Sequence, residues 1–307
     1  MRVTPMLSKI NRRQALKLTA AAAAGLAMPK PAFPQGCMAK EGTVRDRLWL
    51  FACATNSNYQ YLNRRSLMSP AEGAYYLSIP NLLIIQSDEG QTPRFEPPFE
   101  QYAIGLRPLK RVAWSIVGSG GQTSPDERKE VLDLAKSIPN WVGVYMDDFF
   151  FRHNKQGKQA ALTLEELGDI RQQLKNSGKK LDIIATFYTS LLDLPVRDYL
   201  ELIDVIAYWT SNPADLENLS TNLDKLNKLA PLRRVLLGCY FFDYNQRSPL
   251  TVANMKLQCE TGLRWLQQGR IEGIVFLGNT TEDMGFECVE WAREWIQKVG
   301  GTSLRDI

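Results

Sequence analysis

Eight short apolar runs recur along the chain, and segments with helical periodicity separate most of them. Nearly all of these runs are apolar at every position rather than at alternate positions, which is the pattern of strands covered on both faces. Strands that alternate with helices in this way indicate a parallel sheet of the α/β class, and eight of them favour a closed (β/α)8 barrel, the TIM-barrel plan, over an open sheet. The predicted strands are residues 48–54, 82–86, 111–117, 141–147, 181–188, 203–209, 234–241 and 272–278.

Clear helix signals lie between the predicted strands. Ser124 and Glu127 form a capping box, in which each side chain can satisfy a backbone N–H group at the start of a helix. Thr163 and Glu166 repeat this pattern. Residues 87–110 lack such signals and are predicted to form a long loop with at most one short helix. The predicted helices are residues 124–138, 163–178, 212–226, 251–268 and 286–299.

The first 40 residues have the pattern of an export signal rather than of a fold. Basic residues precede an Ala-rich run at 18–28, and a Pro-rich spacer follows it. Arg12 and Arg13 resemble the paired arginines of a twin-arginine signal. The apolar run is well short of the ~20 residues that span a bilayer, so no membrane span is expected. An Ala-rich helix that belongs to the domain is the alternative interpretation.

The expected organisation is therefore an export signal and spacer over residues 1–40, followed by one barrel domain over residues 41–307. We expect export to the periplasm or the cell exterior of a bacterium. The barrel portion has the usual length of a single (β/α)8 domain.

The charge balance excludes two classes of partner. The chain has 37 basic and 33 acidic side chains, but residues 1–40 contain seven of the basic ones and none of the acidic ones. The remaining domain is slightly acidic, and we therefore expect it to bind neither nucleic acid nor an anionic membrane.

The five cysteines do not have the spacing of a small disulfide-stapled protein. Cys53 and Cys239 lie in predicted strands and are expected to be small buried residues. Cys259 and Cys288 lie on the last two predicted helices, which are neighbours in a closed barrel, so a disulfide between them is an open alternative. Cys37 is an alternative site for a lipid anchor.

The fourth predicted strand ends in two adjacent carboxylates, Asp147 and Asp148. A carboxylate beside a core must be solvated, paired or protonated, so this placement is costly unless the acids have a use. In parallel α/β proteins, ligands bind at the carboxyl ends of the strands. The sequence therefore predicts an active site that contains these two residues.

The residues that follow the other predicted strands would lie at the same rim of the barrel. They are rich in amides and aromatic rings, which suit the binding of sugar hydroxyls and the stacking on sugar faces. The candidate substrate-binding residues are Asn56, Gln86, Tyr145, Tyr188, Tyr208, Trp209, Asn212, Tyr240 and Asn279. Asp243, after the seventh strand, is a third candidate catalytic acid.

Several of these residues have a simpler structural interpretation. Asn212 precedes a proline at a predicted helix start and could be a helix cap. Asp243 could stabilise a loop, and Tyr208 or Tyr240 could pack inside the barrel.

Several chemistries are excluded or weakened by the composition. The chain has one histidine, His153, so sites that need two or three imidazoles are excluded. A Ser-His-Asp triad could use only this histidine, and no GxSxG motif accompanies it. The glycine-rich stretch that begins at Gly118 lacks the lysine of a phosphate-binding loop, so a flexible rim loop is expected there. No cofactor is predicted. A divalent metal held by Asp147, Asp148 and amide oxygens stays open.

The remaining inventory suits acid–base chemistry on a sugar, because glycoside cleavage needs a proton donor for the leaving oxygen and a second group at the developing cation. The stretch GVYMDD, residues 143–148, resembles the catalytic strand of barrel glycosidases, most nearly those that act on N-acetylhexosaminides through adjacent aspartates. The resemblance implies that Asp147 orients the 2-acetamido group of the substrate as an internal nucleophile, and that Asp148 is the general acid.

Two related patterns fit the sequence less well. Chitinases are similar in outline, but their alternate acids would fall on four positions of which only Asp147 is acidic, the others being Gly143, Tyr145 and Phe149. Barrel glycosidases with an acid on strand four and a nucleophile on strand seven would use Asp243, but they usually employ glutamate there.

The sequence thus predicts an exported glycoside hydrolase that acts on an oligo- or polysaccharide. A non-catalytic carbohydrate-binding barrel and a metal-dependent lyase or hydrolase are the alternatives.

Overall fold

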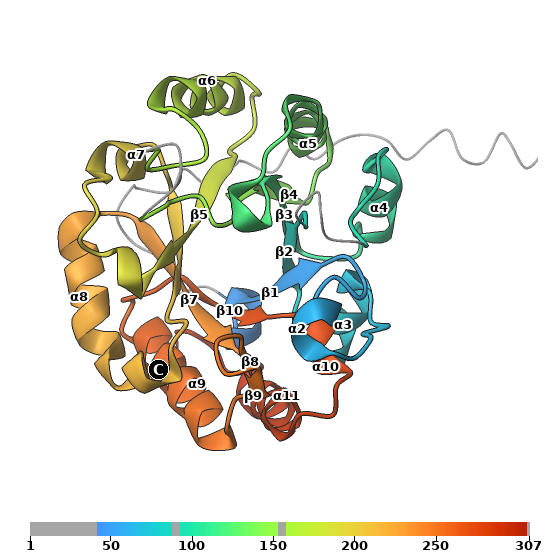
Figure 1. Cartoon of the computed structure of the whole chain (residues 1–307), viewed down its shortest axis with the longest axis vertical. Helices are drawn as coiled ribbons and strands as arrows, with labels where there is room; N and C mark the ends of the chain where they lie inside the picture. The colour runs from blue at the N-terminus through green and yellow to red at the C-terminus, as the bar shows by residue number, and fades with distance from the viewer. Residues whose placement is uncertain (1–41, 88–92, 153–157, 306–307) are drawn as a thin grey trace, which may run out of the picture. The chain divides into compact units, whose positions relative to one another are not determined.

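The computed structural model describes residues 42–87, 93–152 and 158–305, which form a closed parallel barrel (Figure 1). The barrel order is β1-β10-β7-β6-β5-β4-β3-β2, so each strand lies beside its neighbours in sequence and the first strand pairs with the last. The (β/α)8 prediction is confirmed. The strands are β1 (Leu48–Cys53), β2 (Asn81–Ile85), β3 (Arg111–Val117), β4 (Trp141–Met146), β5 (Asp182–Tyr188), β6 (Val205–Trp209), β7 (Arg234–Tyr240) and β10 (Gly273–Leu277).

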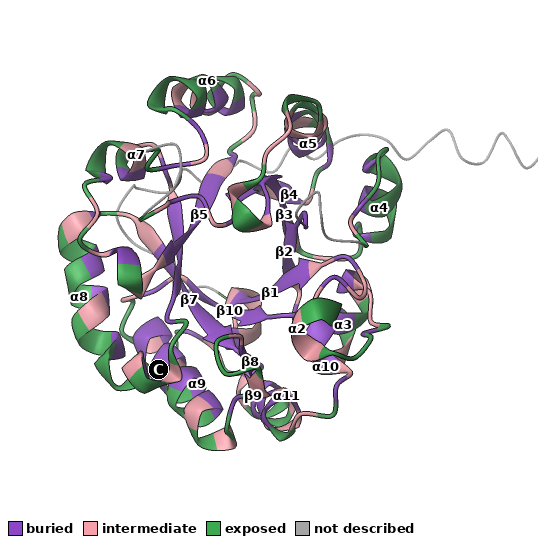
Figure 2. Cartoon of the chain, viewed as in Figure 1, coloured by how far each residue is buried: buried purple, intermediate pink, exposed green. Residues whose placement is uncertain are grey.

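A ring of helices covers the outside of the barrel (Figure 1), and the strands and the inner faces of these helices consist largely of buried residues (Figure 2). A strand that faces the barrel interior on one side and the helices on the other is apolar throughout, which explains the continuous runs in the sequence. The helices are α2 (Tyr59–Leu62), α3 (Pro70–Tyr76), α4 (Glu100–Gly105), α5 (Pro125–Ser137), α6 (Leu164–Lys175), α7 (Arg197–Glu201), α8 (Leu219–Leu229), α9 (Val252–Gln267), α10 (Asn279–Glu282) and α11 (Glu287–Val299).

Short elements join these helices and strands. They are the 3-10 helices η1 (Val44–Arg47), η2 (Ser119–Gly121), η3 (Thr189–Leu191) and η4 (Pro213–Asn218), and a small hairpin formed by β8 (Phe242–Asp243) and β9 (Ser248–Pro249).

The helix starts follow local capping chemistry. At α6 the predicted capping box forms, with the Glu166 N–H donating to Thr163 Oγ1 at 3.1 Å and the Thr163 N–H donating to a carboxylate oxygen of Glu166 at 2.9 Å. Helix α5 begins where expected, but Ser124 makes no side-chain cap hydrogen bond. The predicted helix 212–226 is wrong as one element, because the 3-10 helix η4 precedes α8.

The amino-terminal end of the barrel is closed by charged side chains. Arg234 forms ion pairs with Asp182 at 2.6 Å and Glu272 at 3.3 Å, and the Arg111 guanidinium lies 4.5 Å from the centre of the Trp49 ring. These residues line a cavity of about 180 Å³ in which opposite charges are paired. This end of the barrel therefore holds a structural network of ion pairs.

The cysteines are free thiols in the part of the chain that the structure describes. Helices α9 and α11 pack together as expected, but Cys259 and Cys288 form no disulfide. The Cys259 thiol donates to Met255 Sδ at 3.5 Å and the Cys288 thiol donates to the Phe241 carbonyl at 3.3 Å.

The expected export segment, residues 1–40, and the alternative lipid site Cys37 lie outside the described residues. Among the residues that are described, the search found no helix with the length and apolar character of a membrane span.

Candidate active site

The two acidic residues at the end of β4 are brought to the same side of the chain by a sharp turn. Neighbouring residues of a strand normally point to opposite faces. Asp148 lies just beyond the strand with φ at 43°, in the left-handed region that aspartate tolerates better than most residues. As a result, both carboxylates reach β5, Asp147 at Thr186 and Asp148 at Tyr188.

Asp147 is the buried member of the pair, with 4% of its surface exposed. The Thr186 hydroxyl donates to its Oδ1 atom at 2.8 Å, and the Tyr145 hydroxyl lies 2.6 Å from the same threonine oxygen. Because Thr186 has one hydroxyl proton and donates it to Asp147, Tyr145 must be the donor in the second contact. A chain of two hydroxyl donors therefore ends on Asp147.

Asp148 is half-buried and is held through both carboxylate oxygens. The Tyr188 hydroxyl donates to Oδ1 at 2.5 Å, and the backbone N–H of Gly120 donates to Oδ2 at 2.8 Å. Asp147 is thus the buried acid and Asp148 the more exposed one. The two hydrogen bonds to Asp148 fix the orientation of its carboxylate.

The glycine-rich stretch after β3, expected to be a rim loop, contains a tight turn, η2. The Gly118 N–H donates to the Gln122 carbonyl at 2.8 Å, which closes the turn. Gly121 has φ at 72°, and a Cβ atom there would lie 2.4 Å from the Phe151 ring, so a side chain would not fit. The turn therefore presents the Gly120 N–H to Asp148.

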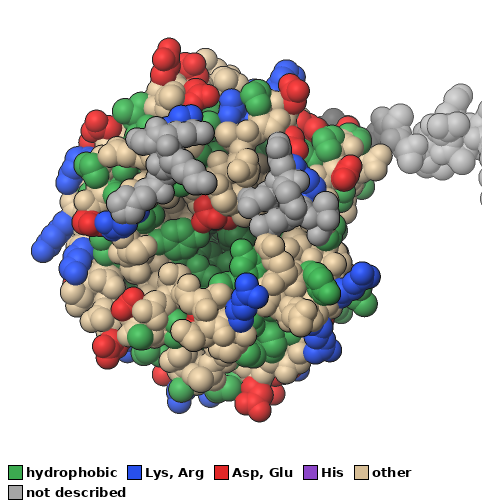
Figure 3. Space-filling view, viewed as in Figure 1, with side chains coloured by type: hydrophobic (Ala, Val, Ile, Leu, Met, Phe, Trp, Pro, Cys, Tyr) green, Lys and Arg blue, Asp and Glu red, His purple; other side chains and the backbone are tan. Residues whose placement is uncertain are grey.

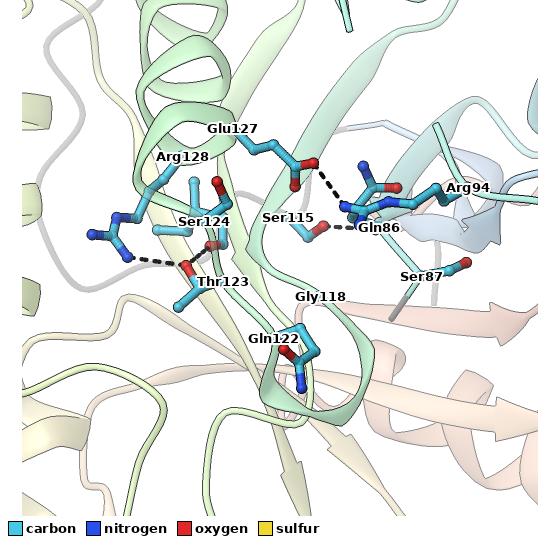
Figure 4. Close-up of a pocket in the computed structure, with 11 residues that line it drawn as sticks. Gln86, Ser87, Arg94, Ser115, Gly118, Gln122, Thr123, Ser124, Glu127 and Arg128 are labelled. Carbon is cyan, nitrogen blue, oxygen red and sulfur yellow. Dashed lines mark hydrogen bonds and ion pairs between the residues drawn. The ribbon is translucent and has the colours of Figure 1, made fainter. Parts of the chain in front are cut away.

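A small polar recess lies behind this turn, between the ends of β2 and β3 and the start of α5 (Figure 4). Arg128 donates to Thr123 Oγ1 at 3.0 Å, and the Thr123 hydroxyl donates to the Ile116 carbonyl at 2.7 Å. Arg94 pairs with Glu127 at 2.7 Å. The cavity is about 10 Å³, room for roughly one water, so the recess supports the turn and does not hold a sugar.

Aromatic rings form the floor beside the two acids. Trp209 on β6 lies 5.0 Å from Tyr240 on β7 and 5.7 Å from Phe51 on β1, measured between ring centres. A Cβ atom at Gly238 would lie 2.1 Å from the indole ring, so glycine is required to seat Trp209. In the space-filling view, a hollow over the barrel centre is lined by hydrophobic side chains, with acidic side chains at its edge (Figure 3).

The negative charges of the pair affect the tyrosines around them. Burial, the neighbouring Tyr240 and the charge of Asp148 raise the pKa of Tyr188 well above its ordinary value. Burial and the charge of Asp148 likewise raise the pKa of Tyr240, and burial and the charge of Asp147 raise that of Tyr145. All three hydroxyls therefore keep their protons and act as hydrogen-bond donors.

Cys53 is half-buried at the end of β1 rather than fully buried as expected. Burial, followed by the charge of Asp147, raises the pKa of the Cys53 thiol to about 12. Since a thiolate is the reactive form, this thiol does not serve as a nucleophile at neutral pH.

Two amide side chains predicted to bind substrate are used inside the protein. The Gln86 amide donates to the Phe95 carbonyl at 2.9 Å and accepts from the Phe95 N–H at 3.0 Å. Asn279 is fully buried and bonds both the N–H and the carbonyl of Cys53, as well as the carbonyl of Met68. The geometry gives both residues a structural role.

Two further candidates stabilise turns. Asp243 is buried, and its Oδ1 atom accepts from the backbone N–H groups of Asn245 at 2.9 Å and Gln246 at 3.1 Å. Asn212 is exposed, and its side chain accepts from the Ala214 N–H at 3.1 Å at the start of η4. The structure thus does not bring them to the acidic pair through any described contact.

Tyr208 and Asn56 differ from the rest of the set. Trp209 contacts rings on other strands across the barrel, so strand alternation directs its neighbour Tyr208 to the helix side. The Tyr208 hydroxyl is buried and has no hydrogen-bond partner among the described residues. Asn56 has a left-handed backbone, with φ at 69°. Its Oδ1 atom is buried and also has no hydrogen-bond partner within residues 42–87, 93–152 and 158–305.

The candidates that the structure does bring together are Asp147, Asp148, Tyr145, Tyr188, Trp209 and Tyr240. Thr186 and the Gly120 N–H complete the group, and neither was among the predicted site residues. The described residues contain no group of three His, Cys, Asp or Glu side chains placed to hold a metal ion.

No protein-family model matches the sequence, and no match is found among curated proteins. Solved structures do share the fold. The glycoside hydrolase domain of PgaB (BpsB) from Bordetella bronchiseptica is 10% identical, with a TM-score of 0.53 over 83% of this chain and 99% of that chain.

Two further solved structures are similar. One is concanavalin B, and the other is a family GH18 chitinase from Cycas revoluta, in complex with allosamidin. The chitinase is 12% identical, with a TM-score of 0.52 over 81% of this chain and 99% of that one. Concanavalin B is 10% identical, with a TM-score of 0.54 over 82% and 99% of the two chains. At these identities the similarity establishes the barrel fold alone.

Proposed function

We propose that the protein is a glycoside hydrolase that acts on an oligo- or polysaccharide. The observation that supports this most is the pair at the end of β4, where a left-handed turn at Asp148 places both carboxylates against donors on β5. Such a turn strains the backbone beside two carboxylates whose burial is energetically unfavourable. This combination is typical of functional sites.

In this proposal Asp148 is the general acid. It is half-buried whereas Asp147 is buried, so of the two acids it is the one that a glycosidic oxygen can approach. Asp147 is its electrostatic partner and polarises a 2-acetamido group of the substrate, which then attacks the anomeric carbon. Trp209 and Tyr240 are buried, with 1% and 9% of their surfaces exposed, so their rings form the apolar support beneath the acids rather than an open stacking face.

The geometry of Asp243 favours this version over a nucleophile on the seventh strand. The Asp243 carboxylate is buried and accepts two backbone hydrogen bonds within its own turn. No described contact joins this carboxylate to the acidic pair on β4, whereas an acetamido group polarised by Asp147 would lie beside the general acid. The substrate group is therefore the better nucleophile.

Release of reducing ends from a panel of glycans tests the proposal. The panel includes N-acetylhexosamine oligomers and matched oligomers that lack the acetamido group. We expect turnover of the acetamido sugars, a loss in Asp147→Asn and Asp148→Asn, and no change in Asp169→Asn, an exposed aspartate on α6. Equal turnover of both series would refute the role of the acetamido group, and binding without turnover would indicate a carbohydrate-binding barrel.

A further inference from the structure

Asp148 needs an external support, because it lies beyond the hydrogen-bonded ladder of β4. The strand ends at Met146, and the turn at Asp148 has a left-handed backbone. Its side chain is held by two donors from other parts of the fold, the Tyr188 hydroxyl on β5 and the Gly120 N–H in η2. Of these, only the hydroxyl can be removed by a side-chain substitution.

We propose that Tyr188 is the positioning residue of Asp148 and that it lowers the reaction barrier through this carboxylate alone. The proposal rests on the glycoside hydrolase function above. Tyr188 is two residues from Thr186, which makes the equivalent contact to Asp147, so β5 supplies one hydroxyl to each acid.

The hydrogen bond gains strength as the reaction proceeds. When Asp148 transfers its proton to the glycosidic oxygen, the electrons of the breaking carbon–oxygen bond go to that oxygen and the carboxyl becomes a carboxylate. Hydrogen bonds to charged acceptors are stronger than those to neutral ones. The Tyr188 and Gly120 donors therefore stabilise the transition state more than the ground state, which is what raises kcat.

Tyr188 is suited to this role because it remains a donor. Burial, the neighbouring Tyr240 and the acidic pair hold its pKa well above the ordinary value. Tyr240 on β7 is thus a close neighbour of Tyr188, and both hydroxyls keep their protons beside the acidic pair.

The chain offers a matched pair of variants. Tyr188→Phe removes the hydroxyl and keeps the ring, whereas Tyr208→Phe removes a buried hydroxyl with no partner among the described residues. In Tyr188→Phe we expect kcat to fall by about 10- to 100-fold with KM within about twofold, because the hydroxyl acts on the transition state and not on substrate binding. Tyr208→Phe should match the wild type. A Tyr188→Phe enzyme with kcat within about twofold of the wild type, or an equal loss in Tyr208→Phe, would overturn the proposal.

Carboxyl 13C NMR of Asp-labelled protein tests the contact without turnover. We expect the carboxyl resonance of Asp148 to move in Tyr188→Phe and to stay unchanged in Tyr208→Phe, because only the first variant loses a hydrogen bond to this carboxylate. If the resonance moves but no glycan is turned over by the wild type, the proposed function fails and the positioning contact stands. If turnover is normal and the resonance does not move, the positioning role fails alone. Should Tyr188→Phe not fold, Tyr188→Leu removes the same hydroxyl and must move the same resonance, and no change refutes the proposal.

Discussion

Glu282 gives the most quantitative prediction, because it is a buried carboxyl with no compensating contact. It lies at the end of α10 with 2% of its surface exposed, and neither of its oxygens has a hydrogen-bond partner among the described residues. Helix α10 packs on α3, where a Cβ atom at Gly73 would lie 3.0 Å from a Glu282 oxygen. Burial, with a smaller contribution from the charge of Asp283, raises the pKa of Glu282 to about 8.

A raised acid pKa in the folded state lowers stability as pH rises. Below the ordinary value of 4.5 both folded and unfolded forms carry the proton, so the full stability is present. Between about pH 4.5 and pH 8 the unfolded form releases its proton while the folded form keeps it, so unfolding becomes easier. The shift corresponds to a loss of about 3 to 4 kcal/mol in the free energy of unfolding between pH 5 and pH 8.

Glu282→Gln removes this titration and keeps the shape of the side chain. Urea unfolding followed by tryptophan fluorescence at pH 5, 6, 7 and 8 measures the difference between variant and wild type. We expect that difference to grow in favour of the variant by about 3 to 4 kcal/mol across the range. Glu165→Gln, an exposed change on α6, should follow the wild type at every pH. Parallel curves for Glu282→Gln and the wild type would show that Glu282 is not buried and neutral as described.

Three other changes test the site. Gly238→Ala places a methyl group where the Trp209 ring lies, so we expect a loss of about 1–3 kcal/mol in urea unfolding together with weaker glycan binding, and unchanged values would contradict the packing. Thr186→Val removes the donor to Asp147 and leaves the Tyr145 hydroxyl without an acceptor, which should cost about 1–3 kcal/mol of stability; a neutral effect would argue against the hydroxyl chain. Dialysis against EDTA should leave turnover unchanged, and a loss restored by a divalent metal would favour a metal-dependent enzyme.

The barrel could be predicted from the sequence because its strands are covered on both faces. Each strand is a continuous apolar run with its own boundaries, and all eight predicted runs overlap the observed strands. Helices were harder where the chain uses short elements. Helix α3 was not predicted, although Ser69, Pro70 and Glu72 carry the same capping box and proline signal that was recognised at other helices.

The site was only partly predictable from the sequence. Its geometry depends on which side chains of each strand face the barrel interior, and on the backbone conformation at the strand ends. The sequence places Tyr208 and Trp209 side by side, but which of them faces the barrel interior depends on strand register. The left-handed turn at Asp148 and the backbone donor at Gly120 have no side-chain pattern that identifies them.

The partners of Gln86 and Asn279 could not be predicted for a different reason. Gln86 is satisfied by Phe95 in the loop that follows its strand, and Asn279 by Cys53 at the other end of the domain sequence. Contacts of this kind depend on how loops and strand ends meet in the folded barrel. Residue type at a strand end therefore identifies candidates, and tertiary hydrogen bonding decides which of them are free to bind.

The central claim is that Asp148 donates the proton in glycoside cleavage. Turnover and glycan binding of Asp148→Asn, measured beside the wild type on the same substrate, test it most directly. We expect turnover to fall by about 10²- to 10⁴-fold while the binding constant changes by no more than severalfold. An Asp148→Asn protein that keeps its turnover, or a wild type that binds glycans and cleaves none, would contradict the claim.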